Sequence, residues 1–347
     1  MILYVTKMAG DAIKHHIDAA SRSGFLGEYP ILTVLGDGRG RGRCARSGAS
    51  VESGAVADQK ATVLTELSLI LAAVFWGTNY AATKYAAEYL PQLPIVAFRF
   101  TVGGLLLLFV LRLLEPESGL ERKDVLPMLG LGCLGVATAQ TAFTFGISLT
   151  SASNTGLVFA TAPVWGLLLG LVLGLERPSR RGILGVTLSI SGIGIVFHEG
   201  LVGAKDASLL GDSLILVAAV GVGAYTVFSM PVLERHSPLV VATYPTLFGA
   251  PVVLLLASPN LPSLDWGVGV GVWAAVGYSA VFATAFAFAA WQGGISRIGA
   301  NRVLVYQYLI TLTGVASGIV FFGERLGMSQ IVGGAVILLG VYLARRQ

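Results

Sequence analysis

One long stretch of the sequence occurs twice. Residues 146–197 align without a gap with residues 294–345, which lie 148 positions further along the chain. A repeating unit of about 140 residues is far longer than the repeats of a solenoid. It is typical of membrane proteins whose chain consists of two similar halves. The identical pairs include Gly146 and Gly294, Ala152 and Ala300, Gly170 and Gly318, and Glu176 and Glu324.

Apolar segments of about 20 residues, long enough to cross a bilayer as a helix, recur ten times after residue 63. Hydrophobic residues make up 54% of the chain and charged residues only 12%, with a mean hydropathy of +0.76. This composition is far more apolar than that of a soluble domain. The sequence therefore predicts an all-α integral membrane protein with five spans in each repeat. The expected spans are 65–87, 94–114, 124–147, 152–174, 180–198, 210–232, 237–257, 266–292, 299–321 and 325–344.

The basic residues of the short loops predict how the chain is oriented. If the N-terminal segment is cytoplasmic, the inner loops carry most of the lysine and arginine, whereas the outer loops hold only Lys205 and Arg325. Both termini are therefore expected in the cytoplasm, and the protein in the inner (cytoplasmic) membrane. Because each repeat has an odd number of spans, the second repeat should run upside down relative to the first. Inverted repeats are the plan used for alternating access.

The first part of the chain differs from the rest. Residues 1–62 combine short apolar runs with the Gly/Arg/Ser-rich stretch GDGRGRGRCARSGAS, which has no helical or strand periodicity. We expect a disordered basic extension, followed by repeats at 63–198 and 208–345. The extension is either an arm that touches anionic headgroups or an unstructured segment without a role. A cleavable signal peptide is not expected, because the opening MILYVTK has no long apolar core.

Short motifs follow one another in a fixed order between residues 64 and 345. They are Trp76-Gly77-Thr78-Asn79, Lys84, Pro94, Arg99-Phe100, Ser151-Ala152-Ser153-Asn154, Ala162-Pro163, Leu175-Glu176-Arg177, Gly299-Ala300-Asn301 and Gly323-Glu324-Arg325-Leu326. In order, spacing and duplication they resemble the drug/metabolite transporter superfamily, and specifically its EamA family of ten-helix exporters and permeases. The resemblance implies transport of small metabolites, most often outward and without nucleotide hydrolysis. The halves are not equivalent, because Thr311 stands where the first repeat has Pro163.

Polar side chains at membrane depth are costly, which makes them candidates for a solute pathway. Asn79, beside Trp76, could bond a solute or tie its helix to a neighbour. Arg99 lies about 7 Å into the membrane if each residue after Pro94 advances about 1.5 Å. Its guanidinium could hold a carboxylate through two hydrogen bonds or extend to the outer headgroups. Lys84 is interpreted as an anchor at the outer interface.

Further candidates lie on the third, eighth and ninth spans. Gln140 and Thr144 share a helical face, and Trp291, Tyr306 and Tyr308 add aromatic surface. Such a cavity would suit a planar or aromatic solute with polar ends. The alternative is that the tyrosines pack within the bundle. The predicted substrate-binding set is Trp76, Asn79, Arg99, Gln140, Thr144, Trp291, Tyr306 and Tyr308.

Two residues of the fourth span are candidates for gating. Pro163 can break its helix, and Gly166 begins a row of glycines at four-residue spacing that allows close helix packing. Glu176-Arg177 and Glu324-Arg325 are interpreted as loop-side charge pairs or helix caps. No Asp, Glu or His lies near the middle of a span, since the glutamates fall at helix ends or in loops. Proton-coupled carriers usually relay through such a group, so the sequence predicts transport that does not depend on a proton gradient.

Several classes of function are disfavoured by what the sequence lacks. The spans contain no HExxH, GxSxG or paired aspartates, so neither an enzyme nor a metal or other cofactor is expected. A channel is disfavoured because no ring of like charges is found. The sequence has no basic patch with aromatic or polar readout residues beside it, so no nucleic-acid partner is expected. A non-catalytic membrane interaction subunit is the remaining alternative to a transporter.

The expected partners are a small-molecule solute and the lipid bilayer. Arg99 and the tyrosines favour an amino acid or related zwitterion, most often exported, over a nucleoside, sugar or drug. A monomer is sufficient because one chain carries both repeats, and a dimer is compatible with the sequence.

Overall fold

The computed structural model describes residues 48–174, 179–201, 208–298, 303 and 306–345, with side chains from Val63 onward. The chain divides into two units, residues 1–64 and 65–347. The described part of the first unit is the beginning of helix α2, which runs Gly48–Ala87. The backbone is therefore helical from Gly48, within the extension expected at 1–62. The prediction for residues 1–47 lies outside the described part of the chain.

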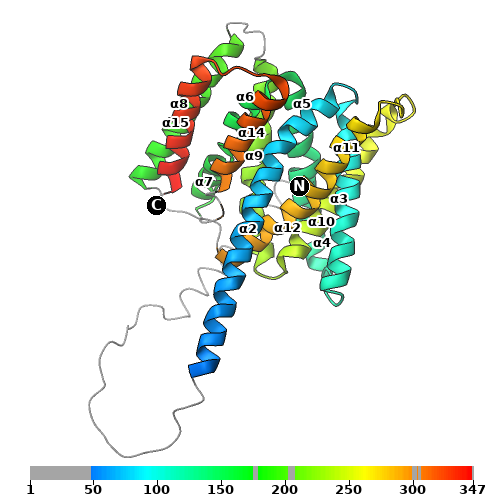
Figure 1. Cartoon of the computed structure of the whole chain (residues 1–347), viewed down its shortest axis with the longest axis vertical. Helices are drawn as coiled ribbons and strands as arrows, with labels where there is room; N and C mark the ends of the chain where they lie inside the picture. Colours follow the sequence, from blue (N-terminus) through cyan, green and yellow to red (C-terminus); the bar gives the residue numbers. More distant parts are fainter. Residues whose placement is uncertain (1–47, 175–178, 202–207, 299–302, 304–305, 346–347) are drawn as a thin grey trace, which may run out of the picture. The chain divides into compact units, whose positions relative to one another are not determined.

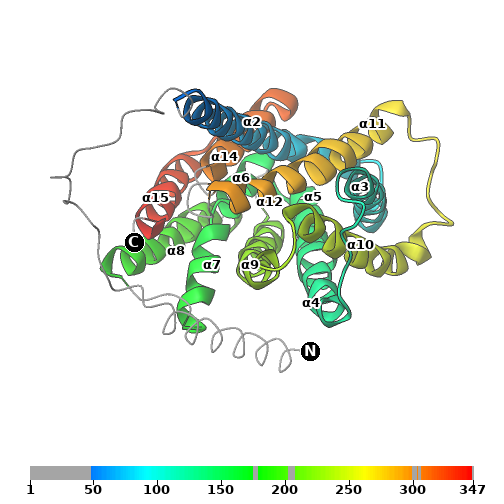
Figure 2. The same cartoon turned by 90° about the horizontal axis from the view of Figure 1, so that it is seen from below.

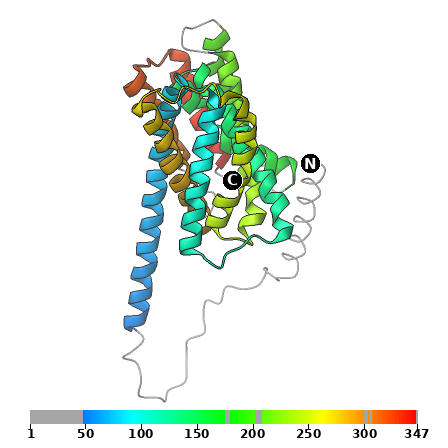
Figure 3. The same cartoon turned by 90° about the vertical axis from the view of Figure 1, so that its right-hand side faces the viewer.

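The described part of the second unit is almost entirely helical. Figures 1 and 3 show its helices packed side by side along their length. They are the rest of α2, then α3 (Gln92–Leu114), α4 (Arg122–Gly132), η1 (Cys133–Gln140), α5 (Thr141–Leu149), α6 (Ala152–Phe159), α7 (Ala162–Val172), α8 (Arg180–Leu201), α9 (Leu209–Leu233), α10 (Pro238–Ala257), η2 (Ser258–Asn260), α11 (Val270–Tyr278), η3 (Ser279–Phe286), α12 (Ala287–Ile298), α14 (Tyr306–Phe322) and α15 (Met328–Arg345).

Eight helical runs in the described residues are long and apolar enough to cross a membrane, and α14 and α15 are shorter apolar helices. Large apolar side chains such as Phe109, Leu255 and Phe321 are exposed. Around a membrane-spanning helix such side chains face lipid, because the backbone polar groups are already bonded within the helix. The protein is therefore a multi-pass membrane protein.

The corresponding helix of each half contains a π-helical segment. In the first half α4 continues through η1 into α5, and in the second half α11 continues through η3 into α12. A π-helical turn changes the directions in which side chains point and is frequent at functional sites. The two segments lie 146 positions apart in the sequence, close to the offset of the repeat.

The fourth span is broken, which its continuous hydropathy does not indicate. Helix α6 ends at Phe159, and α7 begins at Ala162 with Pro163 in its first turn. The aligned helix α14 has Thr311 instead of Pro163 and is continuous. Proline lacks an N–H and disfavours a helical residue before it, which explains the break.

Several predicted boundaries also differ from the structure; the tenth span, for example, begins at Met328 rather than at 325. The eighth span was expected to end at residue 292, but α12 continues to Ile298. In the first half, the corresponding helix α5 likewise extends past its predicted end at residue 147 and continues to Leu149. The predicted start of the ninth span at 299 lies outside the described residues; Val303 is helical, and α14 is described without a gap from Tyr306.

Candidate functional site: a central cavity

A cavity of about 610 Å³ lies in the middle of the second unit. Residues of both halves line it, from α2, α3 and η1 through α7, α9 and α10 to α12 and α14. Seen from below, α7 and α9 lie on one side of the bundle and α2, α12 and α14 on the other (Figure 2). Its volume is in the range of small-molecule sites.

Arg99 is the only Asp, Glu, Lys, Arg or His side chain among the described residues lining the cavity. It comes from α3 and is 3% exposed. Its Nε donates to Thr284 Oγ1 at 2.9 Å, and one terminal nitrogen donates to Gln140 Oε1 at 3.4 Å. Gln140 lies in η1 and Thr284 in η3, so the two π-helical segments hold the guanidinium from opposite halves. The central carbon of the guanidinium, Cζ, lies 4.9 Å from the centre of the Phe100 ring.

Within the described residues Arg99 forms no ion pair. A buried cation is costly unless an opposite charge compensates it. The alternative that Arg99 extends to the outer headgroups is not observed, because its side chain points into the helix bundle. The site is suited to a ligand that brings a carboxylate.

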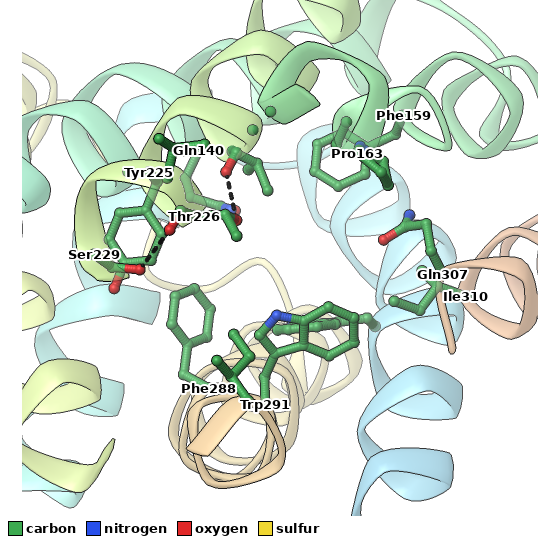
Figure 4. A pocket seen from close by; sticks show the side chains of 18 of the residues that line it. Gln140, Phe159, Pro163, Tyr225, Thr226, Ser229, Phe288, Trp291, Gln307 and Ile310 are labelled. Carbon is green, nitrogen blue, oxygen red and sulfur yellow. Dashed lines mark hydrogen bonds between the residues drawn. The ribbon is translucent and has the colours of Figure 1, made fainter. Parts of the chain in front are cut away.

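Trp76, Asn79 and Trp291 form another part of the wall. The two indole rings are tilted at a centroid distance of 5.0 Å, and Trp76 Nε1 donates to the Ala283 carbonyl at 2.7 Å. Asn79 is buried and accepts from Ser279 Oγ, so its amide oxygen ties α2 to η3. Figure 4 shows Trp291 at the lower side of the cavity, between Phe288 and Gln307.

Three residues of the predicted set do not line the cavity. Thr144 is fully buried and donates to the Gln140 carbonyl at 2.9 Å, within its own helix. Tyr306 packs at the edge of the main core, and Tyr308 Oη donates to the Leu338 carbonyl of α15 at 3.3 Å. Successive residues of a helix point in different directions, and of these neighbours only Gln307 faces the cavity (Figure 4).

Both predicted gating residues, Pro163 and Gly166, line the cavity. Gly166 lies where α7 crosses α9. A Cβ at the facing Gly223 would come within 2.7 Å of the Gly166 nitrogen and 2.6 Å of the Ala162 carbonyl oxygen. The two helices therefore touch through backbone just after the break before Pro163.

The cavity reaches the surface at one end. Ser179, Met230, Ile295 and Ala344 line it there, and they lie at the start of α8 and near the ends of α9, α12 and α15. Met230 is 41% exposed. We call this the Ser179 end, and the opposite end of the same helices the Glu324 end.

The Glu324 end is closed by two layers. The inner layer is aromatic: Tyr80, Phe143 and Phe159 pack with centroid distances of 5.4 to 6.3 Å and line the cavity. Beyond it, the Glu324 carboxylate accepts from the Ala152 and Ser153 N–H groups at 2.8 and 2.9 Å and from Ser153 Oγ at 2.6 Å. These N–H groups begin α6, so Glu324 caps a helix of the other half.

Lys84 lies between the halves in the outer layer. Its ammonium donates to the Thr150 carbonyl at 2.7 Å and lies 3.3 Å from Glu324 Oε1. The prediction of an interface anchor is therefore wrong in this conformation, because the side chain is bound within the protein.

Two buried aspartates were not singled out from the sequence, because the search for Asp, Glu and His concerned the middle of the spans and both lie at helix starts. Asp212, at the start of α9, accepts from Thr150 Oγ1 at 2.6 Å and from the Asn154 amide. Asp124, in the first turn of α4, pairs with Arg235 at 2.9 Å and His236 at 2.7 Å. Neither lines the cavity. Both occupy first turns of helices, where a carboxylate is stabilised by the helix dipole.

Other residues that line the cavity could not be singled out from the sequence. Tyr80, Tyr225, Thr246 and Phe288 are ordinary bundle residues by pattern and reach the cavity only through the way the helices pack. No group of three or more His, Cys, Asp or Glu side chains suited to a metal ion occurs in the part of the chain that the structure describes.

The chain is similar to proteins named as transporters. It is 27% identical to a probable terminal-alkyne amino-acid exporter of Streptantibioticus cattleyicolor, over 81% of this chain and 93% of that protein. It is also 27% identical to a probable amino-acid metabolite efflux pump of Salmonella typhimurium, over 79% and 92%. An uncharacterized transporter of Archaeoglobus fulgidus is 22% identical over 80% of this chain and 98% of its own.

A solved crystal structure that is 23% identical shares the fold, with a TM-score of 0.57 over 81% of this chain and 97% of its own. The family model of the EamA-like transporter family matches residues 63–198 and again 209–346, which coincide with the two halves seen in the sequence and in the π-helical segments. The protein is therefore a membrane transporter rather than an enzyme, and the chain belongs to the EamA-like transporter family.

Proposed function

We propose that the protein exports an amino acid or a closely related zwitterion across the cytoplasmic membrane. The observation that carries this proposal is Arg99, a buried guanidinium in the cavity wall with no acidic partner among the described residues. A carboxylate supplies the missing charge and can accept from a planar guanidinium at two positions. The names of the two 27% identical relatives, a probable terminal-alkyne amino-acid exporter and a probable amino-acid metabolite efflux pump, support the same class of solute.

Transport is proposed to occur by alternating access between two inverted five-span repeats. The cavity opens at the Ser179 end and is covered at the Glu324 end, as expected of one of the two alternating states. With both termini in the cytoplasm, this state faces inward and is ready to load a cytoplasmic solute. The opposite state requires Glu324 to leave the start of α6 while the Ser179 end closes. One chain supplies both repeats, so a monomer suffices.

The driving force is proposed to be the solute gradient or exchange for a second solute. Among the described residues that line the cavity there is no Asp, Glu or His, the groups that usually relay protons in carriers. Asp124 and Asp212 are bound elsewhere in the bundle.

The test is flux of a panel of radiolabelled amino acids in proteoliposomes that contain the full chain, with and without a pH gradient. We expect saturable flux that needs no pH gradient, is lost in Arg99→Ala and is partly retained in Arg99→Lys. Thr243→Val is the control, because Thr243 does not line the cavity and its hydroxyl donates to the Leu239 carbonyl of its own helix at 2.7 Å. Flux of nucleosides or sugars alone, from folded protein, would overturn the proposal.

A further inference from the structure

Three polar side-chain atoms in the cavity wall are buried and have no hydrogen-bond partner within the part of the chain that the structure describes. They are the Tyr80 hydroxyl, Gln292 Oε1 and Gln307 Nε2. The three side chains are 3%, 2% and 7% exposed. A buried polar group that lacks a partner is costly, so such groups usually meet a water or a ligand. Their gathering around one cavity indicates groups that a solute would satisfy.

Gln292 also lines the cavity, from α12, two turns after Thr284, which accepts from Arg99 Nε. Phe288, one turn earlier on the same face of α12, packs edge-on against Phe100 at 6.2 Å, and Phe100 follows Arg99 in the chain. The Gln292 side chain is hydrogen-bonded to Tyr225, and since Oε1 is without a partner, this bond uses the amide nitrogen. An acceptor oxygen in the cavity wall is thus left without a partner among the described residues, and the ammonium of an amino acid is a donor that would satisfy it.

Gln307 lies at the other side of the cavity. Figure 4 shows it on α14 next to Ile310, facing Phe159 and Pro163, with Trp291 between it and Phe288. The Gln307 atom without a partner is Nε2, a hydrogen-bond donor, so the ligand has to supply an acceptor. The wall between the two amides is the indole and phenyl surface of Trp76, Trp291 and Phe288.

We propose that Gln307 is a specificity-determining residue that reads the side chain of the transported amino acid. This inference rests on the proposed function. With the carboxylate at Arg99 and the ammonium at Gln292, the solute's side chain extends along the indoles toward Gln307. The preferred solute then carries a neutral side chain with a hydrogen-bond acceptor at its end, such as a carboxamide or another carbonyl. Lysine-like side chains are disfavoured, because the described lining holds no carboxylate to receive them.

The preference should change with the residue at position 307. In proteoliposomes holding the full chain, we compare flux of glutamine, leucine and lysine by the wild type, Gln307→Leu and Gln307→Glu. Gln307→Leu should lower the glutamine-to-leucine ratio of kcat/KM about tenfold, the factor that ~1.4 kcal/mol gives. Gln307→Glu should raise lysine flux relative to glutamine. Gln92→Leu is the matched control, because Gln92 bonds Ser148 at 3.2 Å and does not line the cavity.

The thermal midpoint of each variant separates recognition from folding. Replacing a polar group that has no partner by an apolar one is nearly neutral or stabilising, so Gln307→Leu should melt no lower than the wild type. An unchanged glutamine-to-leucine ratio in Gln307→Leu would overturn the inference, as would a lowered midpoint with equal loss of all three fluxes. If that ratio stays fixed while Arg99→Ala still abolishes flux, only the inference fails. Absence of any amino-acid flux in folded wild-type protein overturns both.

Discussion

Lys84 and Glu324 come from opposite halves of the chain and meet at 3.3 Å, over the closed end of the cavity. The ion pair does not stand alone, because Glu324 also accepts three hydrogen bonds from Ala152 and Ser153 at the start of α6. One carboxylate thus joins α2, α6 and the segment after α14. The aromatic layer of Tyr80, Phe143 and Phe159 lies directly beneath it.

Removing this carboxylate should open the Glu324 end more often. Glu324→Ala deletes a helix cap, a change that typically costs about 0.5–2 kcal/mol, and frees Lys84 as well. In a protein whose native cysteines are serines, a cysteine at position 159 should react about tenfold faster with a membrane-impermeant thiol reagent applied at the Glu324 end. Glu88→Ala, near the same end of α2, is the control and should leave the rate unchanged. Equal rates in Glu324→Ala and the control would show that the carboxylate does not hold this end closed.

Closure at the Glu324 end should depend on pH with a defined sign. Burial raises the pKa of Glu324, but hydrogen bonds from Ser153 and Ala152 together with Lys84 outweigh it and leave the pKa below its ordinary 4.5. The charged carboxylate therefore stabilises the closed state. This stabilisation is complete above the ordinary pKa of 4.5 and is lost as the pH falls from 4.5 through the lowered pKa of Glu324.

Spin labels at Tyr89 and Met328, two exposed residues on either side of this end, report the change. The distance distribution should be constant near neutral pH and broaden below pH 4.5, whereas Glu324→Gln should show no such pH dependence. A transition near neutral pH, or the same transition in Glu324→Gln, would assign the effect to another group.

The packing of α8 against α15 depends on glycine. A Cβ at Gly185 would lie 2.3 Å from the Ala344 nitrogen and 2.6 Å from the Gly340 oxygen, whereas one at Gly194 would meet nothing within 4 Å. Gly185→Ala should therefore destabilise the protein by about 1–3 kcal/mol. Gly194→Ala, in the same helix, should be neutral or stabilise by up to about 1 kcal/mol. Thermal unfolding in detergent compares the two, and a Gly185→Ala midpoint equal to that of Gly194→Ala would contradict this packing.

Asp124 should contribute far more to stability than the exposed Glu121, which lies three residues before it, just outside α4. Asp124→Ala leaves Arg235 and the mostly buried His236 without their carboxylate, which should cost about 3 kcal/mol. Glu121 pairs with Lys123 at the surface, where the side chains are 64% and 60% exposed. Such pairs contribute about 0–1 kcal/mol, so Glu121→Ala should have little effect on the unfolding midpoint. Comparable losses in the two variants would contradict the role assigned to Asp124.

The sequence by itself determined the membrane class, the duplication and the family. Hydropathy, the 148-residue offset and the ordered motifs are properties of the linear chain, because the bilayer dictates the length and polarity of each segment. Arg99 could likewise be singled out, since an arginine within an apolar segment is costly wherever its helix packs.

Only the tertiary structure decided which polar residues share the cavity. Tyr306, Gln307 and Tyr308 are neighbours in sequence, yet the angle between successive helical side chains leaves only Gln307 on the cavity. The π-helical turns at Gln140 and Thr284 depend on local backbone geometry that hydropathy does not encode, whereas the break before Pro163 could be anticipated from the proline itself. The meeting of Lys84 with Glu324, across 240 residues of chain, is a product of how two similar halves pack.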